Sequence, residues 1–594
     1  MTNRLANFLA AGLLVIMACL AIASIANDTL TFDEKAHIGA GYSYLAKQDY
    51  RLNPEHPPLI KDIAALPLMF LRLNFPKQDW ENGAPVPWWL QYNFGDQLLY
   101  HSGNNPDQIM FFARLGPILI LILLGIFLYF WAKKLMGAGP ALFLLALFVF
   151  CPNFMANGRL VTTDVGASFG AVIATYFWLQ FLKKPSWKNV IVAGLIFGIA
   201  MLLKFSLILL IPFFVIITLV YAWLKEKNFK NLLRYCLLSV AAGLIGLIFV
   251  IGPVYQFNIA HYPYEKQLND TKITLNDMPK LPAALKNLDI FMAGQPMLRP
   301  WAQYLLGLEM ATNRTGTGNT TYFMGTVSAQ SRIDYFPTLY LFKVPTAFHV
   351  LTLIVLIWLA FCFIKNNAFK NTWPKLRDWI LRYFDFFAML VFLGIYWFTS
   401  LTGNLNIGLR HILPTFAFTY MLVVFGLVEF LKGIKSEKNK KIAKGVIAAL
   451  LAWFVFSSLS IFPHYLAYYN ELAGGPDNGY KIAVDSNLDW GQDLKRLDIW
   501  MQDNGVNKIY LDYFGGGDPA YYLGDKYINW DNNNQSFLEL PKGSYFAVSA
   551  NQMQGQRAKA VMGYDQPTNK YNWLDQYEPP LTKIGYSIFV YQIK

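Results

Sequence analysis

The chain has 594 residues, of which 55% are hydrophobic, 16% aromatic and only 15% charged. This composition excludes a purely soluble protein and predicts a membrane protein. The formal net charge is +13, but the lysines and arginines lie mainly in short connectors between apolar runs, as membrane topology requires. We therefore expect no nucleic acid partner. The four cysteines fall in or beside apolar runs without metal-ligand spacing, which indicates membrane-core residues.

Apolar runs of helical length recur along the chain and predict about eleven transmembrane helices. No convincing small-residue cleavage site follows the first run, so we predict a retained helix and not a signal peptide. The runs cover residues 5–26, 109–132, 140–157, 165–182, 189–203, 205–224, 235–256, 337–364, 384–401, 411–431 and 445–462.

Positive charge alternates between these runs and predicts their orientation. The side assigned to the cytoplasm carries Arg4, Lys133, Lys183, residues 225–234, residues 365–382 and the cluster 432–444. The opposite side receives the loops 27–108 and 257–336, the turn 402–410 and all residues after 463. Polar residues gather there at helix ends, which weighs against an ion pathway through the bilayer. We expect a multi-pass protein of the cell (plasma) membrane whose active surface faces the extracytoplasmic side.

The composition changes toward the C-terminus. From about Gly474 the apolar runs shorten, Asn, Asp, Gly and Tyr become frequent, and strand-like segments at 508–514, 544–549 and 587–593 alternate with turns. The predicted fold is an α-helical polytopic membrane protein with a small C-terminal extracytoplasmic α/β domain. We place the transmembrane catalytic domain at 1–462 and the soluble domain at 463–594.

The most informative stretch lies in the first outer loop, where carboxylates, imidazoles and a lysine are close in sequence. Its members are Asp33, Glu34, His37, Glu55, His56 and Lys61. A carboxylate at the edge of the hydrocarbon can take a proton from a hydroxyl, and cations can neutralise a leaving phosphate. Prolines 57 and 58 stiffen the loop and can hold His56 in one direction. The alternative is that this segment only begins an interfacial helix.

The string Phe32-Asp33-Glu34-x-x-His37-x-Gly39, followed by His56-Pro57-Pro58-Leu59-x-Lys61, resembles the first extracytoplasmic loop of the protein O-mannosyltransferases. Glu55-His56-Pro57-Pro58 lies where the related aminoarabinose lipid A transferases carry Glu-Lys-Pro. Both groups belong to the GT-C class of glycosyltransferases, which use polyprenyl-phosphate sugars as donors. The resemblance extends over about residues 5–462 and implies the GT-C fold.

The resemblance also implies roles for individual residues. Asp33 matches the acid that binds or deprotonates the acceptor, with Glu34 beside it and Asp164 as the second acidic position. The donor phosphate is expected near His56, Lys61, Lys204 and Arg410, and other substrate contacts near Glu55, His37, His411 and Arg314. Three of these have ordinary alternatives: Asp164 as a helix N-cap, Lys204 as a snorkelling lysine and Arg410 as an interfacial anchor.

A third acidic string, residues 485–494, contains Asp485, Asp489 and Asp493. Its spacing is not that of an EF-hand and no histidine joins it, so we expect Asp489 or Asp493 to cap a helix while Trp490 packs below. No metal site is predicted and the chemistry requires no cofactor. A divalent metal ion is compatible with this chemistry but is not required by it.

These observations favour an inverting transferase that moves a sugar from a polyprenyl phosphate to a protein, lipid or glycan acceptor, with the bilayer as its other partner. Mannose is the sugar that part of the class implies. A lipid-linked sugar flippase or transporter is the alternative, and a glycan sensor anchored by its helices is a third hypothesis. The chain lacks the inserted luminal domain of eukaryotic protein O-mannosyltransferases, which leaves its acceptor open.

Overall fold

A computed structural model describes residues 2–82, 87–226, 228–365, 372–532 and 534–594. Within these residues, nine helical segments are long and apolar enough to cross a membrane. They are α1 (Asn3–Ser24), α6 (Pro106–Met136), α9 (Asp164–Lys183), α11 (Leu210–Glu226) with the preceding turn Phe205–Leu209, α12 (Phe229–Gly246) continuing into α13 (Gly252–Asn258), α18 (Thr346–Lys365), α20 (Phe384–Thr402), α21 (Leu413–Gly433) and α22 (Glu437–Ser460).

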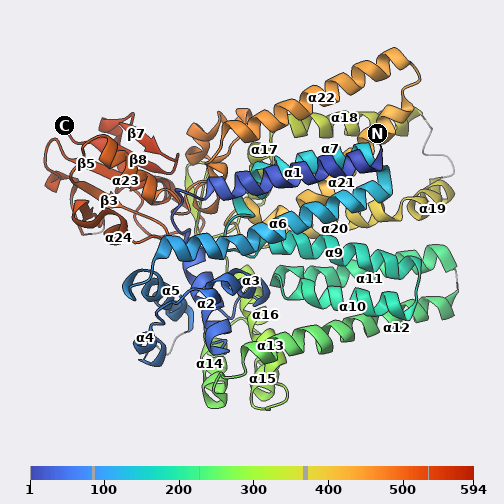
Figure 1. Ribbon diagram of the computed structural model, residues 1–594, viewed down its shortest axis with the longest axis horizontal. Helices are drawn as coiled ribbons and strands as arrows, with labels where there is room; N and C mark the ends of the chain where they lie inside the picture. The colour runs from blue at the N-terminus through green and yellow to red at the C-terminus, as the bar shows by residue number, and fades with distance from the viewer. Residues whose placement is uncertain (1, 83–86, 227, 366–371, 533) are drawn as a thin grey trace.

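Two shorter apolar helices complete the set, α7 (Ala138–Val149) and α10 (Trp187–Met201). Together these helices fall on the eleven predicted apolar runs and confirm an α-helical, multi-pass membrane protein. They lie side by side in one bundle, with the N-terminus at one end and the C-terminal residues at the other (Figure 1). Local chemistry sets where some of them begin: Asn105 caps α6 ahead of Pro106, and Ser186 caps α10.

The first outer loop folds into short helices at the end of the bundle that also carries the C-terminus (Figure 1). They are α2 (Phe32–Lys47), α3 (Leu59–Ala65), α4 (Lys77–Asn82) and α5 (Pro87–Asp96). Helix α2 packs against both α3 and α5. A Cβ at Gly41 would collide with the carbonyl oxygen of Lys61, so the α2–α3 contact requires glycine there.

The second outer loop lies at the same end (Figure 1). It contains α14 (Tyr264–Asn276), α15 (Ala283–Ala293), α16 (Arg299–Thr317), the strands β1 (Thr321–Phe323) and β2 (Thr326–Ser328), and α17 (Tyr335–Lys343). Helix α8 (Pro152–Asn157) follows α7, and α19 (Thr372–Arg382) lies at the opposite end of the bundle.

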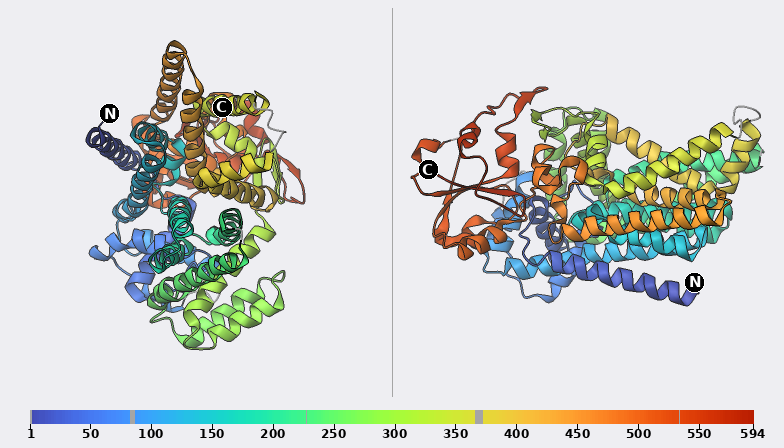
Figure 2. Two further views of the ribbon diagram at one scale, coloured as in Figure 1. Left: turned by 90° about the vertical axis from the view of Figure 1, so that its right-hand side faces the viewer. Right: turned by 90° about the horizontal axis from the view of Figure 1, so that it is seen from above.

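The C-terminal residues form a mixed sheet with helices, and this confirms the predicted α/β character. The elements are α23 (Leu494–Asp503), β3 (Ile509–Asp512), α24 (Pro519–Leu523), β4 (Tyr527–Asn529), β5 (Tyr545–Ser549), α25 (Ala550–Gly555), β6 (Lys559–Val561), β7 (Thr582–Ile584) and β8 (Ile588–Gln592). The strand order is β4-β3-β5-β8-β7, with β3 parallel to β5 and β5 antiparallel to β8. The sheet lies beyond one end of the helical bundle (Figure 2).

A second, three-stranded sheet connects the two parts of the chain. Strand β6 of the C-terminal region pairs in parallel with β2 of the second outer loop, and β2 pairs with β1 as a hairpin. Backbone hydrogen bonds therefore connect residues that the sequence places in separate domains. The boundary at 462/463 stays a prediction.

Candidate active site

A cavity of about 390 Å³ opens at the end of the bundle that carries the two outer loops and the C-terminal sheet. Its volume is in the range of small-molecule sites. The wall comes mainly from α2, the loop before α3, the turn before α11, α16, α20 and the turn before α21. Its charged and imidazole lining residues are Asp33, His37, Glu55, His56, Lys204, Arg314, Arg410 and His411. The sequence had selected all eight.

An ionic cluster around Arg410 forms one wall. The Nη1 atom of Arg410 lies 3.0 Å from Asp33 Oδ2 and 3.5 Å from Asp164 Oδ2. The other oxygen of Asp164 accepts a hydrogen bond from Lys204 Nζ at 2.5 Å. Asp164 is fully buried, whereas the side chain of Asp33 is 22% exposed. The cluster therefore leaves Asp33 as its accessible carboxylate.

For two residues, these contacts weigh against the ordinary alternative to a role in the site. Asp164 is the first residue of α9 and Thr163 occupies the N-cap position, so Asp164 does not act as the cap. Lys204 is 8% exposed and is paired with Asp164, so it does not extend to the lipid interface as a snorkelling lysine would.

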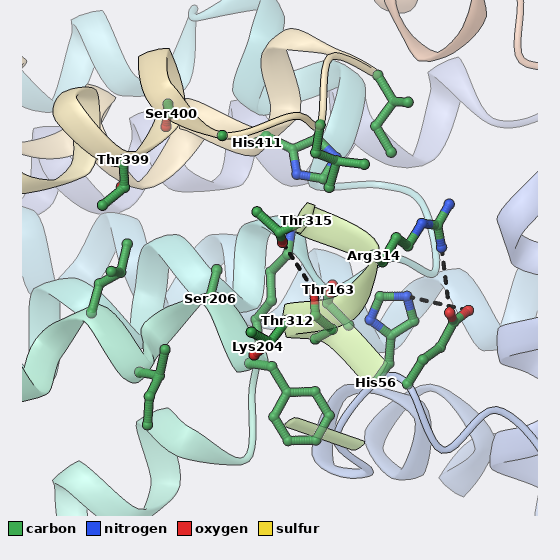
Figure 3. Close-up of a pocket in the computed structure, with 18 of the residues that line it drawn as sticks. His56, Thr163, Lys204, Ser206, Thr312, Arg314, Thr315, Thr399, Ser400 and His411 are labelled. Atoms are coloured by element: carbon green, nitrogen blue, oxygen red, sulfur yellow. Dashed lines mark hydrogen bonds and ion pairs between the residues drawn. The ribbon is translucent and has the colours of Figure 1, made fainter. Parts of the chain in front are cut away.

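Glu55, His56 and Arg314 form a second group of lining residues, and His56 and Arg314 lie near each other in Figure 3. Arg314 Nη1 lies 3.4 Å from Glu55 Oε2, and His56 Nε2 lies 3.9 Å from Oε1. Burial raises the pKa of Glu55 to about 7, although Arg314 opposes that shift. Burial also lowers the pKa of His56 well below its usual value, so His56 is a neutral hydrogen-bonding group at neutral pH.

The remaining imidazoles are His37 and His411. His37 Nδ1 is 2.7 Å from the carbonyl oxygen of Val161, and its ring meets that of His56 edge-on at 5.0 Å. His411 lines the cavity, and its buried Nε2 has no hydrogen-bond partner within the described residues. A buried polar atom without a partner is costly. His411 is therefore a natural contact for a ligand.

Glu34, predicted to be catalytic, is not among the residues that line the cavity. It is fully buried, and Arg114 donates to both of its oxygens, Nε to Oε1 at 2.8 Å and Nη2 to Oε2 at 2.6 Å. The backbone N–H groups of Thr31 and Val161 also donate to it, at 3.0 and 2.9 Å. The structure therefore gives Glu34 the role of fixing the start of α2 against α6.

Lys61, predicted near the donor phosphate, is also placed elsewhere. Its fully buried Nζ bonds to the hydroxyl of Tyr44 at 2.9 Å, to both oxygens of Asn53 at 2.9 and 2.8 Å, and to the carbonyl of His56 at 2.8 Å. Burial lowers the pKa of Lys61 well below its usual value. The lysine holds the loop that presents Glu55 and His56, and it is not a lining residue of the cavity.

Sequence reasoning missed the hydroxyl side chains of the cavity. Several are labelled in Figure 3, and the full set is Thr163, Ser206, Thr312, Thr315, Tyr396, Thr399 and Ser400. Their signal was weak because isolated hydroxyls in apolar helices usually bond to the carbonyl one turn earlier. Thr312 and Ser400 do form that bond, at 2.8 Å each.

The acidic string at 485–494 does not form the expected helix cap. Asp493 occupies the N-cap position of α23, but its side chain makes no capping bond and instead accepts from Ser587 at 2.7 Å. Asp489 accepts from the backbone N–H of Asn551 at 2.8 Å, and Trp490 is buried, as expected. Across the described ranges, no group of three or more His, Cys, Asp or Glu side chains is arranged to hold a metal ion.

Comparisons with known proteins agree with this architecture. Residues 103–255, about a quarter of the chain, match the family described as dolichyl-phosphate-mannose-protein mannosyltransferase. No curated protein sequence matches the chain. Among solved structures, the S. cerevisiae protein O-mannosyltransferase Pmt1–Pmt2 complex bound to the sugar donor is similar at a TM-score of 0.52 and 10% identity, over 78% of this chain and 90% of that one.

Two further structures are similar at lower scores. The archaeal oligosaccharyltransferase AglB from Archaeoglobus fulgidus, in complex with an inhibitory peptide and a dolichol-phosphate, has a TM-score of 0.45 at 11% identity, over 93% of this chain and 71% of that one. ArnT from Cupriavidus metallidurans, bound to undecaprenyl phosphate, has a TM-score of 0.44 at 12% identity, over 100% of this chain and 98% of that one.

The similarity to the protein O-mannosyltransferase defines the class of fold. The chain has the fold of the GT-C glycosyltransferases, and this confirms the resemblance inferred from the first outer loop.

Proposed function

We propose that this protein is an inverting glycosyltransferase of the cell membrane. It transfers a sugar from a polyprenyl-phosphate donor to a hydroxyl or amine of a protein, lipid or glycan acceptor on the extracytoplasmic side. The observation that carries the proposal is the ion pair between Asp33 and Arg410, 3.0 Å apart in the cavity wall. It places a proton acceptor beside a cation suited to a phosphate.

The charges of the cavity favour an anionic ligand. Three cationic side chains meet there, those of Arg410, Lys204 and Arg314. The two carboxylates of the ionic cluster balance two of these charges. The third cation, Arg314, faces Glu55, and Glu55 is only partly ionised at neutral pH because burial raises its pKa to about 7. A sugar phosphodiester would place its negative charge beside these three cations.

The chemical step follows from this arrangement. The acceptor oxygen or nitrogen attacks the anomeric carbon of the sugar while Asp33 takes its proton. The bond between that carbon and the phosphate oxygen breaks, and the electron pair leaves with the polyprenyl phosphate. Arg410, Lys204 and Arg314 neutralise the charge that develops on the leaving group. One displacement of this kind inverts the anomeric configuration.

Exposure separates the roles of the two acids in the cluster. Asp164 is fully buried and bonded to Lys204, so it is suited to orienting the cations. Asp33 lines the cavity and can reach an acceptor. We therefore assign proton transfer to Asp33 and positioning to Asp164.

The position of the cavity supports an outward-facing site. Helices α2 and α16, which contribute to its wall, lie at the end of the bundle opposite the link between α21 and α22, where the predicted cytoplasmic cluster 432–444 begins (Figure 1). The sugar is proposed to be mannose because the matching family and the yeast protein of similar fold carry that activity in their names. The flippase alternative is not favoured by any of these similarities.

The test is Asp33→Asn in purified protein supplied with a labelled polyprenyl-phosphate mannose and membrane extract as the acceptor source. Transfer is expected to fall by about 10²–10⁴-fold, the usual contribution of a general base. Asp96→Asn is the matched control, since Asp96 lies in the same loop, pairs with Lys35 at 2.7 Å and is not a lining residue. Unchanged transfer by Asp33→Asn would contradict the assignment, and a product with retained configuration would contradict single displacement.

A further inference from the structure

The C-terminal segment 486–492 reaches the ionic cluster of the cavity. Ser486 Oγ accepts a hydrogen bond from Arg410 Nε at 3.2 Å and donates its own proton to the carbonyl of Ile407 at 2.6 Å. Next to it, the side-chain oxygen of Asn487 accepts from the backbone N–H of Leu409 at 3.0 Å. Both residues therefore bind the turn that carries Arg410.

Trp490 covers the flat face of the same arginine. Its ring centre lies 4.1 Å from the guanidinium carbon of Arg410, and the indole is only 1% exposed. A cation over an indole ring is attracted most strongly when both are removed from water. Arg410 donates hydrogen bonds from Nε to Ser486 and from Nη1 to Asp33, whereas its Nη2 makes no hydrogen bond within the described residues. That nitrogen is left for a phosphate oxygen.

The same segment also holds the helix that carries Asp33. The backbone N–H of Phe32 donates to the carbonyl of Trp490 at 3.0 Å. Thr29, three residues before the start of α2, donates two hydrogen bonds to the segment. Its backbone N–H donates to the carbonyl oxygen of Gln492 at 2.8 Å, and its hydroxyl donates to the carbonyl oxygen of Gly491 at 2.6 Å. Both partners of the Asp33–Arg410 pair are thus fixed by one short stretch of chain.

The segment is itself anchored on two sides. Lys343, at the end of α17, donates to the carbonyl of Asn487 and to those of Leu466 and Tyr468, the latter two at 3.0 Å. On the other side, Asp489 accepts from Asn551 at the start of α25. These bonds connect the segment to the second outer loop through α17 and to helix α25 of the C-terminal region.

We propose that Ser486 and Trp490 are positioning residues that aim the guanidinium of Arg410 at the donor phosphate, so that the C-terminal region is part of the catalytic unit. The inference rests on the proposed function. A free arginine side chain has many rotamers, and binding a phosphate oxygen from a single orientation requires that most of them be excluded. The indole face and the serine hydroxyl exclude them before the donor arrives.

The experiment compares Trp490→Phe, which keeps an aromatic face, with Trp490→Leu, which keeps apolar packing but has no ring. The donor KM is expected to rise about 30-fold in Trp490→Leu, the fold-change that corresponds to a desolvated cation–π contact. It should rise much less in Trp490→Phe, and kcat should change less than KM in both. Trp530→Leu is the control, because Trp530 is 2% exposed in the C-terminal region and packs on Phe546 with its ring 5.7 Å away.

A role that is only structural gives a different result. It would lower the melting temperature equally in Trp490→Leu and Trp530→Leu while leaving the donor KM of both unchanged, and that outcome would overturn the inference. A second experiment introduces Trp490→Leu into a protein that already carries Arg410→Lys and measures the donor KM. If Trp490 acts through the guanidinium, Trp490→Leu should add little to Arg410→Lys, whereas additive effects would contradict the inference.

Binding of polyprenyl phosphate alone separates the two proposals. Wild-type protein that binds it, with Ser486→Ala and Trp490→Leu binding more weakly, supports both. If wild type and both variants bind it equally well and transfer sugar equally well, only the positioning role is overturned. Wild-type protein that neither binds polyprenyl phosphate nor transfers sugar from it overturns the proposed function together with the inference.

Discussion

Removing the carboxylate of Glu34 tests whether this residue acts in catalysis or in folding. In Glu34→Ala, the fully buried Arg114 loses its bidentate partner, whose two bonds measure 2.8 and 2.6 Å. The backbone N–H groups of Thr31 and Val161 lose their acceptor as well. The hydroxyl of Thr31, which donates to the same carboxylate at 3.0 Å, loses its acceptor too, so five hydrogen bonds disappear from a buried site.

The magnitude follows from the charge left behind. Breaking a buried ion pair by removing one partner costs about 3–5 kcal/mol, chiefly because the remaining charge stays buried without compensation. Removing both charges leaves no such penalty and is often close to neutral. Glu34→Ala should therefore be strongly destabilised, and adding Arg114→Met should recover a large part of the loss.

The assay measures the two properties separately. Thermal unfolding of the protein in detergent, followed by intrinsic fluorescence, reports the stability of each variant. Sugar transfer is then expressed per folded molecule at a temperature well below unfolding. For Glu34→Ala with Arg114→Met, the transfer rate should fall far less than the about 10²–10⁴-fold expected on losing a general base. Unchanged stability of Glu34→Ala, together with a loss of that size, would refute the reasoning and return Glu34 to the catalytic group.

Two further predictions concern the loop that faces Arg314. Burial raises the pKa of Glu55 from 4.5 to about 7, so between these pH values the native protein holds a proton that the unfolded chain has released. The stability of the protein should therefore fall as the pH rises across that window. Glu55→Gln should flatten this part of the plot of melting temperature against pH, and an unaltered plot would count against the shift. Lys61→Met should leave the buried side-chain oxygen of Asn53 without its donor, at a cost of about 1–3 kcal/mol. A melting temperature equal to that of the wild type would contradict the role given to Lys61.

The sequence predicted the fold well because hydropathy depends on local composition. Each of the eleven apolar runs coincides with helical structure, and the three strand-like segments after 474 correspond to β3, β5 and β8. The pairing of β6 with β2 was not predicted. Its partners are more than two hundred residues apart in sequence, and short strands carry no signal that selects a distant neighbour.

The structure separates Asp33 from Glu34, which the sequence assigns to one site, for a geometric reason. Successive residues of a helix point about 100° apart, so two adjacent acids at the start of α2 need not face the same cavity. Asp33 faces the cavity, and Glu34 points to Arg114. The capping-box pattern of Thr31 and Glu34 was the available sign of a structural role for the second acid.

Arg410 shows why the rest of the site was beyond prediction from spacing. Its contacts come from α2 through Asp33, from α9 through Asp164, and from the C-terminal region through Ser486 and Trp490. The sequence suggests a phosphate-binding arginine in the turn before α21, but it does not indicate what orients that side chain. Since those partners lie on separate segments, the guanidinium reaches its final geometry only when the bundle and the C-terminal region have come together. Folding of that region and binding of the donor phosphate should therefore depend on each other.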